Sequence, residues 1–191
     1  MVAYLAKTFD DEIARRLLAG EVGLLPTDTI YGLSCRALDR IAVERIHRLK
    51  DRSAHKPLIV LISDIKMLDL LSISASQAEP AKKYWPGRLS LEFQAPSSPE
   101  WLHQSLEHFA IRLPDHKELR ELINKVGPIV STSANIEGGQ PVKTVAEAQK
   151  LFAEHLDFYV DFGKLDNPPS TLAIIEGGRL KVVRQGAVKI D

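Results

Sequence analysis

The chain has 191 residues, of which 45% are hydrophobic and 26% are charged. This length suffices for one well-formed core and is short for two. Lys plus Arg and Asp plus Glu number 25 each, so the formal net charge is zero. This balance argues against a protein that binds nucleic acid by bulk positive charge, and any anion site must be local.

The single cysteine, Cys35, excludes an intramolecular disulfide and a cysteine-rich zinc site. A reduced, cytoplasmic setting fits this composition, and we expect Cys35 to be a small buried residue. No apolar run approaches the roughly 20 residues needed to cross a bilayer, so no membrane association is expected. Residues 1–7 lack the long apolar stretch of a signal peptide.

The first quarter of the chain alternates helical and strand patterns. Residues 8–11 have capping-box spacing, which predicts a helix that ends near Gly20. Residues 22–25 are predicted to form a strand and residues 27–32 a polar loop closed by glycine. Asp39 is the expected cap of a second helix, whose apolar residues recur at helical spacing.

The middle of the chain begins with a short apolar run, residues 58–62, that reads as a buried strand. Two short helices are expected within residues 64–84. Apolar and polar residues alternate over 89–93, and 109–113 is a further apolar run, so both are predicted strands. Asp115 is the expected cap of a helix over residues 116–126.

The last third contains a strand at 129–132, a helix after a cap at Thr144, and strands at 158–162, 171–175 and 180–183. The sequence Glu176-Gly-Gly-Arg179 predicts a hairpin between the last two strands. This mixture indicates an α/β fold with a twisted, open, mixed sheet and flanking helices, as one domain over residues 1–191. Open α/β sheets bind ligands beyond the ends of their strands.

Three cations, Lys50, Arg52 and Lys56, fall within seven positions on a predicted helix-to-strand connection. Cations that repel one another are kept together by a polyanion such as a nucleotide phosphate chain. The alternative is a set of ordinary solvated surface charges.

Two hydroxyl-rich segments follow predicted strands. Thr27 and Thr29 project to one side if their loop is extended, and Ser131-Thr-Ser-Ala-Asn135 offers three hydroxyls, an amide and backbone N–H groups that could form an anion nest. Such groups bind a phosphate or a zwitterionic amino acid. The alternative is that both segments are turns with self-satisfied hydroxyls. The sequence contains neither a Walker P-loop nor G-x-G-x-x-G, H-E-x-x-H or G-x-S-x-G.

Taken in order, these segments resemble those of the YrdC/TsaC-type threonylcarbamoyl-AMP synthases. The matching pieces are Pro26-Thr-Asp-Thr-Ile-Tyr-Gly-Leu33, Lys50-x-Arg52, Lys56-Pro-Leu58, Trp85-Pro-Gly87, Ala110-Ile-Arg-Leu-Pro-Asp115, Gly127-Pro-Ile-Val-Ser-Thr-Ser-Ala-Asn135, Pro169-Ser-Thr171 and Arg184-Gln-Gly186. The similarity covers nearly the whole chain.

The resemblance implies a YrdC-like domain with a large concave basic face and a nucleotidyltransferase activity. L-threonine, bicarbonate and ATP, with Mg²⁺, would give threonylcarbamoyl-AMP and pyrophosphate. Partner proteins would use the product to modify adenosine 37 of transfer RNA. Weak affinity for transfer RNA or double-stranded RNA is compatible with this role.

The resemblance also implies roles for ten residues. Lys50 and Arg52 would be catalytic, and no residue is assigned to a metal. The expected ATP contacts are Arg52, Lys56, Ser133, Asn135 and Arg184, and the expected threonine contacts are Thr29, Arg112, Ser131 and Ser170. Arg112 interrupts an apolar strand, and a buried arginine needs an anionic partner, either a ligand or a structural carboxylate.

Three positions depart from the family pattern: Ser53 replaces a proline, Arg88 replaces another proline, and Leu61 replaces a histidine found in many members. Two other functions remain as alternatives. One is an RNA-binding module without catalysis, which the zero net charge disfavours. The other is carbamoyl transfer, by enzymes of hydrogenase maturation that carry a YrdC-like domain with acylphosphatase and zinc-finger segments, for which this sequence has no counterpart.

Overall fold

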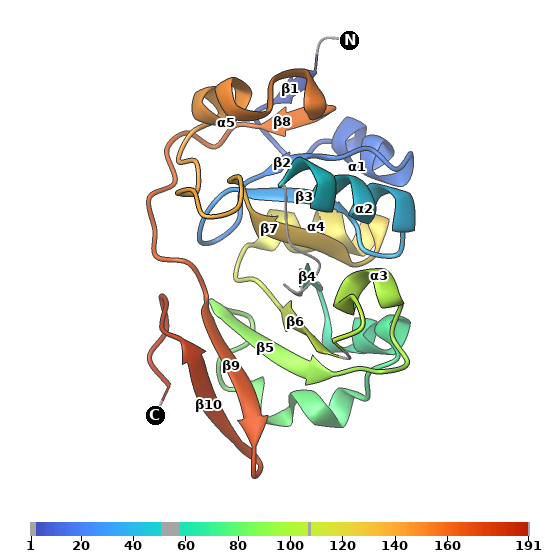
Figure 1. Cartoon of the computed structure of the whole chain (residues 1–191), viewed down its shortest axis with the longest axis vertical. Helices are drawn as coiled ribbons and strands as arrows, with labels where there is room; N and C mark the ends of the chain where they lie inside the picture. The colour runs from blue at the N-terminus through green and yellow to red at the C-terminus, as the bar shows by residue number, and fades with distance from the viewer. Residues whose placement is uncertain (1–2, 51–57, 107, 191) are drawn as a thin grey trace.

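The computed structural model describes residues 3–50, 58–106 and 108–190. These residues form an α/β fold around a mixed sheet of ten strands in the order β1-β8-β2-β3-β7-β4-β6-β5-β9-β10 (Figure 1). The sheet contains both parallel and antiparallel pairs; β4 pairs parallel with β6, for example, and antiparallel with β7. The predicted fold class is confirmed.

The described strands are β1 (Tyr4–Ala6), β2 (Gly23–Leu25), β3 (Gly32–Arg36), β4 (Ile59–Leu61), β5 (Leu89–Gln94), β6 (His108–Arg112), β7 (Ile129–Ser133), β8 (Phe158–Val160), β9 (Thr171–Glu176) and β10 (Arg179–Arg184). The described α-helices are α1 (Asp11–Leu18), α2 (Arg40–Leu49), α3 (Glu100–His103), α4 (Lys117–Val126) and α5 (Val145–Phe152). Three 3₁₀ helices are η1 (Ile65–Leu71), η2 (Ala75–Ala81) and η3 (Ala153–His155).

Helices cover the two faces of the sheet unequally. On one face, α2, α3, α5, η1 and η2 pack against alternate strand residues such as Leu33, Val130 and Ile111. On the other face, α1 and α4 form a smaller core with residues that include Leu25 and Ile129. In Figure 1, α2 lies in front of the sheet and α4 behind it. The second face is therefore covered by helices over only part of the sheet.

The helix caps agree with the sequence at two of four predicted positions. Asp39 accepts a hydrogen bond from the backbone N–H of Ala42, and Thr144 caps α5 in the same way. The N-cap of α1 is Asp10 and not Thr8, with which the predicted capping box began. The Asp10 carboxylate accepts a hydrogen bond from the backbone N–H of Ile13 at 2.9 Å. The cap of α4 is His116 rather than Asp115. Both corrections move the helix start by one or two residues.

Three elements were not predicted: β1, β3 and α3. The most consequential is β3, which pairs antiparallel with β2 and with β7. It begins at Gly32, the glycine that closes the predicted polar loop. After β8, residues 161–170 run along one side of the sheet to β9 (Figure 1). Among the described residues, no helix has the length and apolar character to cross a membrane.

Candidate active site

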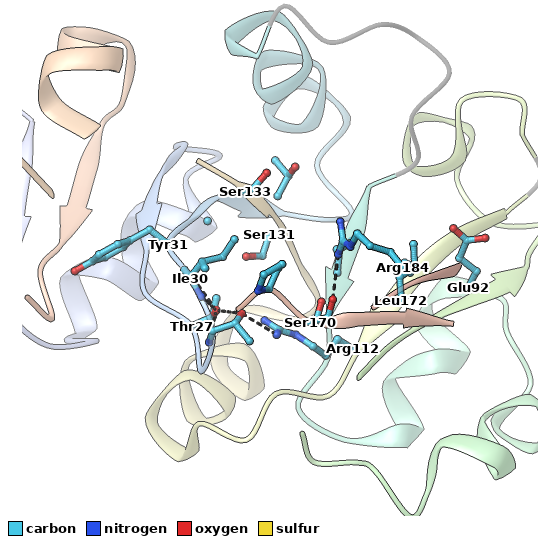
Figure 2. A pocket seen from close by; sticks show the side chains of 16 residues that line it. Thr27, Ile30, Tyr31, Glu92, Arg112, Ser131, Ser133, Ser170, Leu172 and Arg184 are labelled. Atoms are coloured by element: carbon cyan, nitrogen blue, oxygen red, sulfur yellow. Dashed lines mark hydrogen bonds between the residues drawn. The ribbon is translucent and has the colours of Figure 1, made fainter. Parts of the chain in front are cut away.

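A cavity of about 260 Å³ opens on the incompletely covered face of the sheet (Figure 2). Its walls come from the loop before β3, from β4, β5, β6, β7 and β9, and from the end of β10. Six of the ten predicted site residues line it: Thr29, Arg112, Ser131, Ser133, Ser170 and Arg184. Residues 155 positions apart in the sequence thus share one hollow.

The alternation of side chains along a strand explains why these residues meet. Ser131 and Ser133 lie on β7 two and four residues after Ile129, which belongs to the core under α1 and α4. Arg112 follows Ala110 on β6 by two residues, and both line the cavity. Successive residues of a strand point to opposite faces, so these side chains share a face with the α1/α4 core and lie beyond its cover.

The loop of residues 27–31 presents the hydroxyl of Thr29 to the cavity. The Thr27 hydroxyl donates to the carbonyl of Ile30 at 2.8 Å, and the Thr27 and Thr29 hydroxyl oxygens lie 3.0 Å apart. The proton of Thr29 therefore points to Thr27, which leaves the Thr29 oxygen as an acceptor. The prediction that both hydroxyls lie on one side is confirmed, and the self-satisfied alternative holds for Thr27.

Arg112 is 4% exposed and has two protein partners at the cavity. Its Nη1 donates to the Thr29 hydroxyl at 3.0 Å, and its Nη2 lies 3.4 Å from Oδ1 of Asp28. Among the described residues, its Nε has no hydrogen-bond partner. Burial lowers the pKa of the Arg112 guanidinium, while Asp28 opposes this shift and Arg88 adds to it. The structural carboxylate that the sequence left open is Asp28, and the Nε–H group of Arg112 has no acceptor among the described residues.

Gly32 allows β3 to approach β7 closely. A Cβ atom at Gly32 would lie 2.3 Å from Oγ of Ser131, far inside van der Waals contact. Gly32 has an ordinary backbone conformation, so the glycine is required by this approach and not by its φ angle. The bare backbone of Gly32 leaves the Ser131 hydroxyl its place at the cavity.

Lys50 organises the end of β7. Its ammonium group donates to the carbonyl of Ser133, to the carbonyl of Asn135 at 2.9 Å, and to the Asn135 side-chain oxygen at 3.2 Å. The Ser133 hydroxyl donates to the same amide oxygen at 2.6 Å. Lys50 is 2% exposed. Lys50 and Asn135 therefore adjoin the cavity through Ser133, without being among the described residues that line it.

The predicted anion nest at the end of β7 is wrong. The backbone N–H of Ala134 donates to the carbonyl of Tyr31 at 3.2 Å, and that of Asn135 donates to the carbonyl of Ser133 at 3.0 Å. Both N–H groups are thus engaged within the protein. Ser133 itself lines the cavity, and its hydroxyl donates to the side-chain oxygen of Asn135.

The C-terminal segment completes the cavity. The Ser170 and Ser90 hydroxyls lie 2.8 Å apart, and Arg184 donates from Nη2 to the carbonyl of Ser170 at 3.2 Å. The Thr171 hydroxyl accepts from the backbone N–H of Gly186 at 3.0 Å. These contacts fasten the end of β10 against the start of β9 and hold Arg184 at the rim (Figure 2).

Two of the predicted cations, Arg52 and Lys56, lie outside the described residues. The cavity and near-cavity residues that were not predicted as site residues include Asp28, Glu92, Asn167 and Tyr31. Glu92 lines the cavity from β5, and Asn167 donates to the carbonyl of Thr29 at 3.2 Å. Tyr31 has a sequence signal in the motif that contains Thr27 and Thr29, but its hydroxyl donates to the carbonyl of Gly163, away from the cavity.

Known proteins are similar to this chain in sequence and in fold over most of its length. A family model for the Sua5, YciO and YrdC proteins, described as "Telomere recombination", matches residues 15–186. The threonylcarbamoyl-AMP synthase of Pseudoalteromonas translucida is 33% identical over 171 residues, which cover 86% of this chain and 91% of that protein. The synthase of Pseudomonas fluorescens strain Pf-5 is 32% identical over 184 residues, covering 91% and 95%.

Two solved structures have the same fold. P. abyssi Sua5 complexed with L-threonine is 28% identical with a TM-score of 0.85, and the match covers 97% of this chain and 57% of that longer chain. E. coli YciO has a TM-score of 0.84 over 99% of this chain and 97% of its own, at 21% identity. The resemblance drawn from the sequence is thereby confirmed, and the chain belongs to the Sua5, YciO and YrdC family.

Proposed function

We propose that this chain is a threonylcarbamoyl-AMP synthase and that the cavity is its active site. The reaction would join L-threonine, bicarbonate and ATP into threonylcarbamoyl-AMP with release of pyrophosphate. The product would serve the threonylcarbamoyl modification of adenosine 37 in transfer RNA. Curated relatives at about 30% identity over most of the chain carry the name of this synthase, which supports the enzyme class.

One observation carries the assignment of the site: a first group, of hydroxyls and a buried guanidinium, and a second group, Ser133 and Arg184, line the same cavity. The first group suits a small zwitterion and the second suits a phosphate. The guanidinium of Arg112 lines the cavity and would receive the carboxylate of threonine, because a guanidinium binds carboxylates through paired N–H donors. The Sua5 relative solved with L-threonine supports this reading.

The remaining hydroxyls would seat the polar groups of threonine. The oxygen of Thr29 is available as an acceptor for an amine or hydroxyl proton, since its own proton is directed to Thr27. Ser131 and Ser170 face the same hollow from β7 and from the start of β9. All three are neutral, so they orient the substrate without opposing its charges.

The chemistry places an electrostatic demand on the protein. The neutral amine of threonine captures carbon dioxide to give a carbamate, and a carbamate oxygen then attacks the α-phosphorus of ATP as pyrophosphate leaves. Both reactants are anions, so charge repulsion is the main cost. Fixed cations offset this cost and stabilise the charge on the pentacoordinate phosphorus. Transfer at phosphorus otherwise requires mostly positioning.

The ATP contacts follow from the resemblance and from the described neighbours. Arg184 and Ser133 line the cavity and would contact the nucleotide, as would Arg52 and Lys56. Lys50 would act by holding the Ser133–Asn135 turn while adding positive charge beside it. The described residues contain no group of three His, Cys, Asp or Glu side chains that could hold a metal ion. Mg²⁺ would enter the site with ATP, since this ion usually keeps several waters and binds substrate phosphates.

Mass spectrometry of the product tests the proposal. The purified chain, mixed with ATP, Mg²⁺, bicarbonate and L-threonine, should yield threonylcarbamoyl-AMP, and pyrophosphate release should require both threonine and bicarbonate. Arg112→Ala should raise the threonine KM, whereas Arg120→Ala, which removes an arginine that pairs with Asp115 at 3.6 Å on the surface, should not. Pyrophosphate release that is independent of threonine would contradict the synthase.

The cellular context of the reaction is also proposed. The product would be consumed by partner proteins that transfer the threonylcarbamoyl group to transfer RNA, in the cytoplasm. An RNA-binding module without catalysis would instead bind duplex RNA strongly at moderate salt with a steep salt dependence. A binding titration at several salt concentrations separates this alternative from the enzyme.

A further inference from the structure

The loop before β3 contains a buried carboxylate, Asp28, to which the family resemblance gave no role. Its side chain is 4% exposed, and that of Arg112 is 5% exposed. Its Oδ2 accepts from the backbone N–H of Asp115 at 3.2 Å, and its Oδ1 lies 3.4 Å from Nη2 of Arg112. A buried carboxylate is costly without compensation, so its place beside Arg112 requires a reason.

The contacts of Arg112 fix the orientation of its guanidinium group. Thr29 receives a hydrogen bond from Nη1, and Oδ1 of Asp28 lies 3.4 Å from Nη2 as an ion pair without a hydrogen bond, so the group is held from two sides. The third nitrogen, Nε, has no hydrogen-bond partner among the described residues, although it is buried. A purely structural ion pair would be expected to use all its buried donors. This pair leaves the Nε–H group without an acceptor in a residue that lines the cavity.

The charges around Arg112 point to the same role. Arg88 is close enough to oppose the charge of Arg112, and burial disfavours that charge as well. Asp28 provides the opposing negative charge and is anchored by the backbone at the start of α4 through Asp115. Without it, the buried guanidinium of Arg112 would lose the carboxylate that pairs with it at 3.4 Å.

We infer that Asp28 is a positioning residue: it holds the guanidinium of Arg112, which lines the cavity, in the orientation that meets the carboxylate of the amino-acid substrate. This inference rests on the proposed function for the identity of the substrate. Asp28 does not itself line the cavity, so it acts through Arg112. The orientation of the Arg112 side chain thus depends on Asp28 and Thr29, which contact it where the loop before β3 packs on the end of β6.

Two variants and one control test the inference. Asp28→Ala removes both the acceptor and the charge, whereas Asp28→Asn keeps the size and one acceptor oxygen. Asp115→Asn is the matched control, because that carboxylate is 74% exposed and contributes only its backbone N–H to Asp28. Thermal unfolding of each variant establishes that the fold is retained.

The first measurement uses the free protein. The Nε–Hε signal of Arg112 in ¹⁵N relaxation experiments should report a rigid group in the wild type and in Asp115→Asn. It should report a mobile group in Asp28→Ala. A rigid Arg112 in a folded Asp28→Ala variant overturns the inference, whatever the enzyme does. Should Asp28→Ala not fold, Asp28→Asn should still show increased mobility, and an unchanged signal there overturns it.

The second measurement uses the reaction. Asp28→Ala should raise the threonine KM by about tenfold or more, since a misplaced charged hydrogen bond costs at least that factor, while the ATP KM changes less than about twofold. Asp28→Asn should lie between the wild type and Asp28→Ala. An equal rise in the KM for threonine and in the KM for ATP would indicate a merely structural role for Asp28 and overturn the inference. Absence of threonine-dependent turnover in the wild type would instead refute the proposed function and leave the relaxation result standing.

Discussion

Replacing Gly32 by alanine tests how the strands β3 and β7 shape the threonine side of the cavity. The new Cβ atom would lie 2.3 Å from Oγ of Ser131 but 3.5 Å from its Cβ and 3.4 Å from the carbonyl oxygen of Thr132. Only the hydroxyl collides. Since the backbone at Gly32 is accessible to alanine, the least costly response is rotation of the Ser131 side chain to another staggered rotamer.

The expected magnitudes follow from that single collision. Rotation of one serine hydroxyl should change the free energy of unfolding by less than about 1 kcal/mol. A lost hydrogen bond to a charged ligand group costs about 1.5–3 kcal/mol, which corresponds to roughly 10- to 100-fold weaker threonine binding. Ser131→Ala should weaken binding to a similar extent, because it removes the same hydroxyl.

A double-mutant cycle provides the assay. Threonine dissociation constants from calorimetry, and threonine KM values from pyrophosphate release, are compared for wild type, Gly32→Ala, Ser131→Ala and the double variant. With Ser131 already replaced, the alanine at position 32 has nothing closer than ordinary contact, so the double variant should match Ser131→Ala. If the double variant instead binds threonine more weakly than Ser131→Ala by the factor measured for Gly32→Ala alone, then Gly32→Ala moves the strands and the reasoning is refuted.

Three further expectations follow from the structure. Arg112→Lys should raise the threonine KM about tenfold or more at near-constant stability, because an ammonium lacks the fixed fork of the guanidinium; steady-state kinetics check this. Gly23→Ala should lower the free energy of unfolding by about 1–3 kcal/mol or more, measured with urea, since a Cβ there lies 2.4 Å from the buried ring of Phe158. Cys35 is fully buried, and burial raises the pKa of its thiol, so it should react with a thiol reagent only in denaturant.

The local elements were largely predictable because their signals are local. Alternation marked β5, the caps Asp39 and Thr144 marked two helices, and the paired glycines marked the hairpin of β9 and β10, where Gly177 and Gly178 both have positive φ angles. The strand β3 also alternates, with Leu33 and Cys35 in the core. It was not predicted because Gly32, its first residue, is also the residue expected to end the preceding loop.

The contacts that build the site were less accessible to sequence reasoning. The residues that line the cavity were found through resemblance to a family, whereas Asp28 had to be seen beside Arg112, 84 positions away, before a role could be given to it. Likewise, nothing local indicates that the ammonium of Lys50 binds the carbonyls at the end of β7. Long-range pairs of this kind depend on strand order, which the chain does not state locally.

A physical regularity nevertheless connects the sequence to the site. On the face covered by α1 and α4, strands β7 and β4 carry the apolar residues Ile129 and Leu61 where helices cover them. Two residues further along β7, Ser131 takes the place that the pattern reserves for an apolar side chain, and on the neighbouring β6 Arg112 does so in register with Leu61. A polar group at a core-facing position costs stability unless it is paired. Polar residues at core-facing positions of several strands therefore mark the boundary where the covering helices end and a ligand would pack instead. This is why the loss of apolar character and the proposed binding of substrate coincide in this fold.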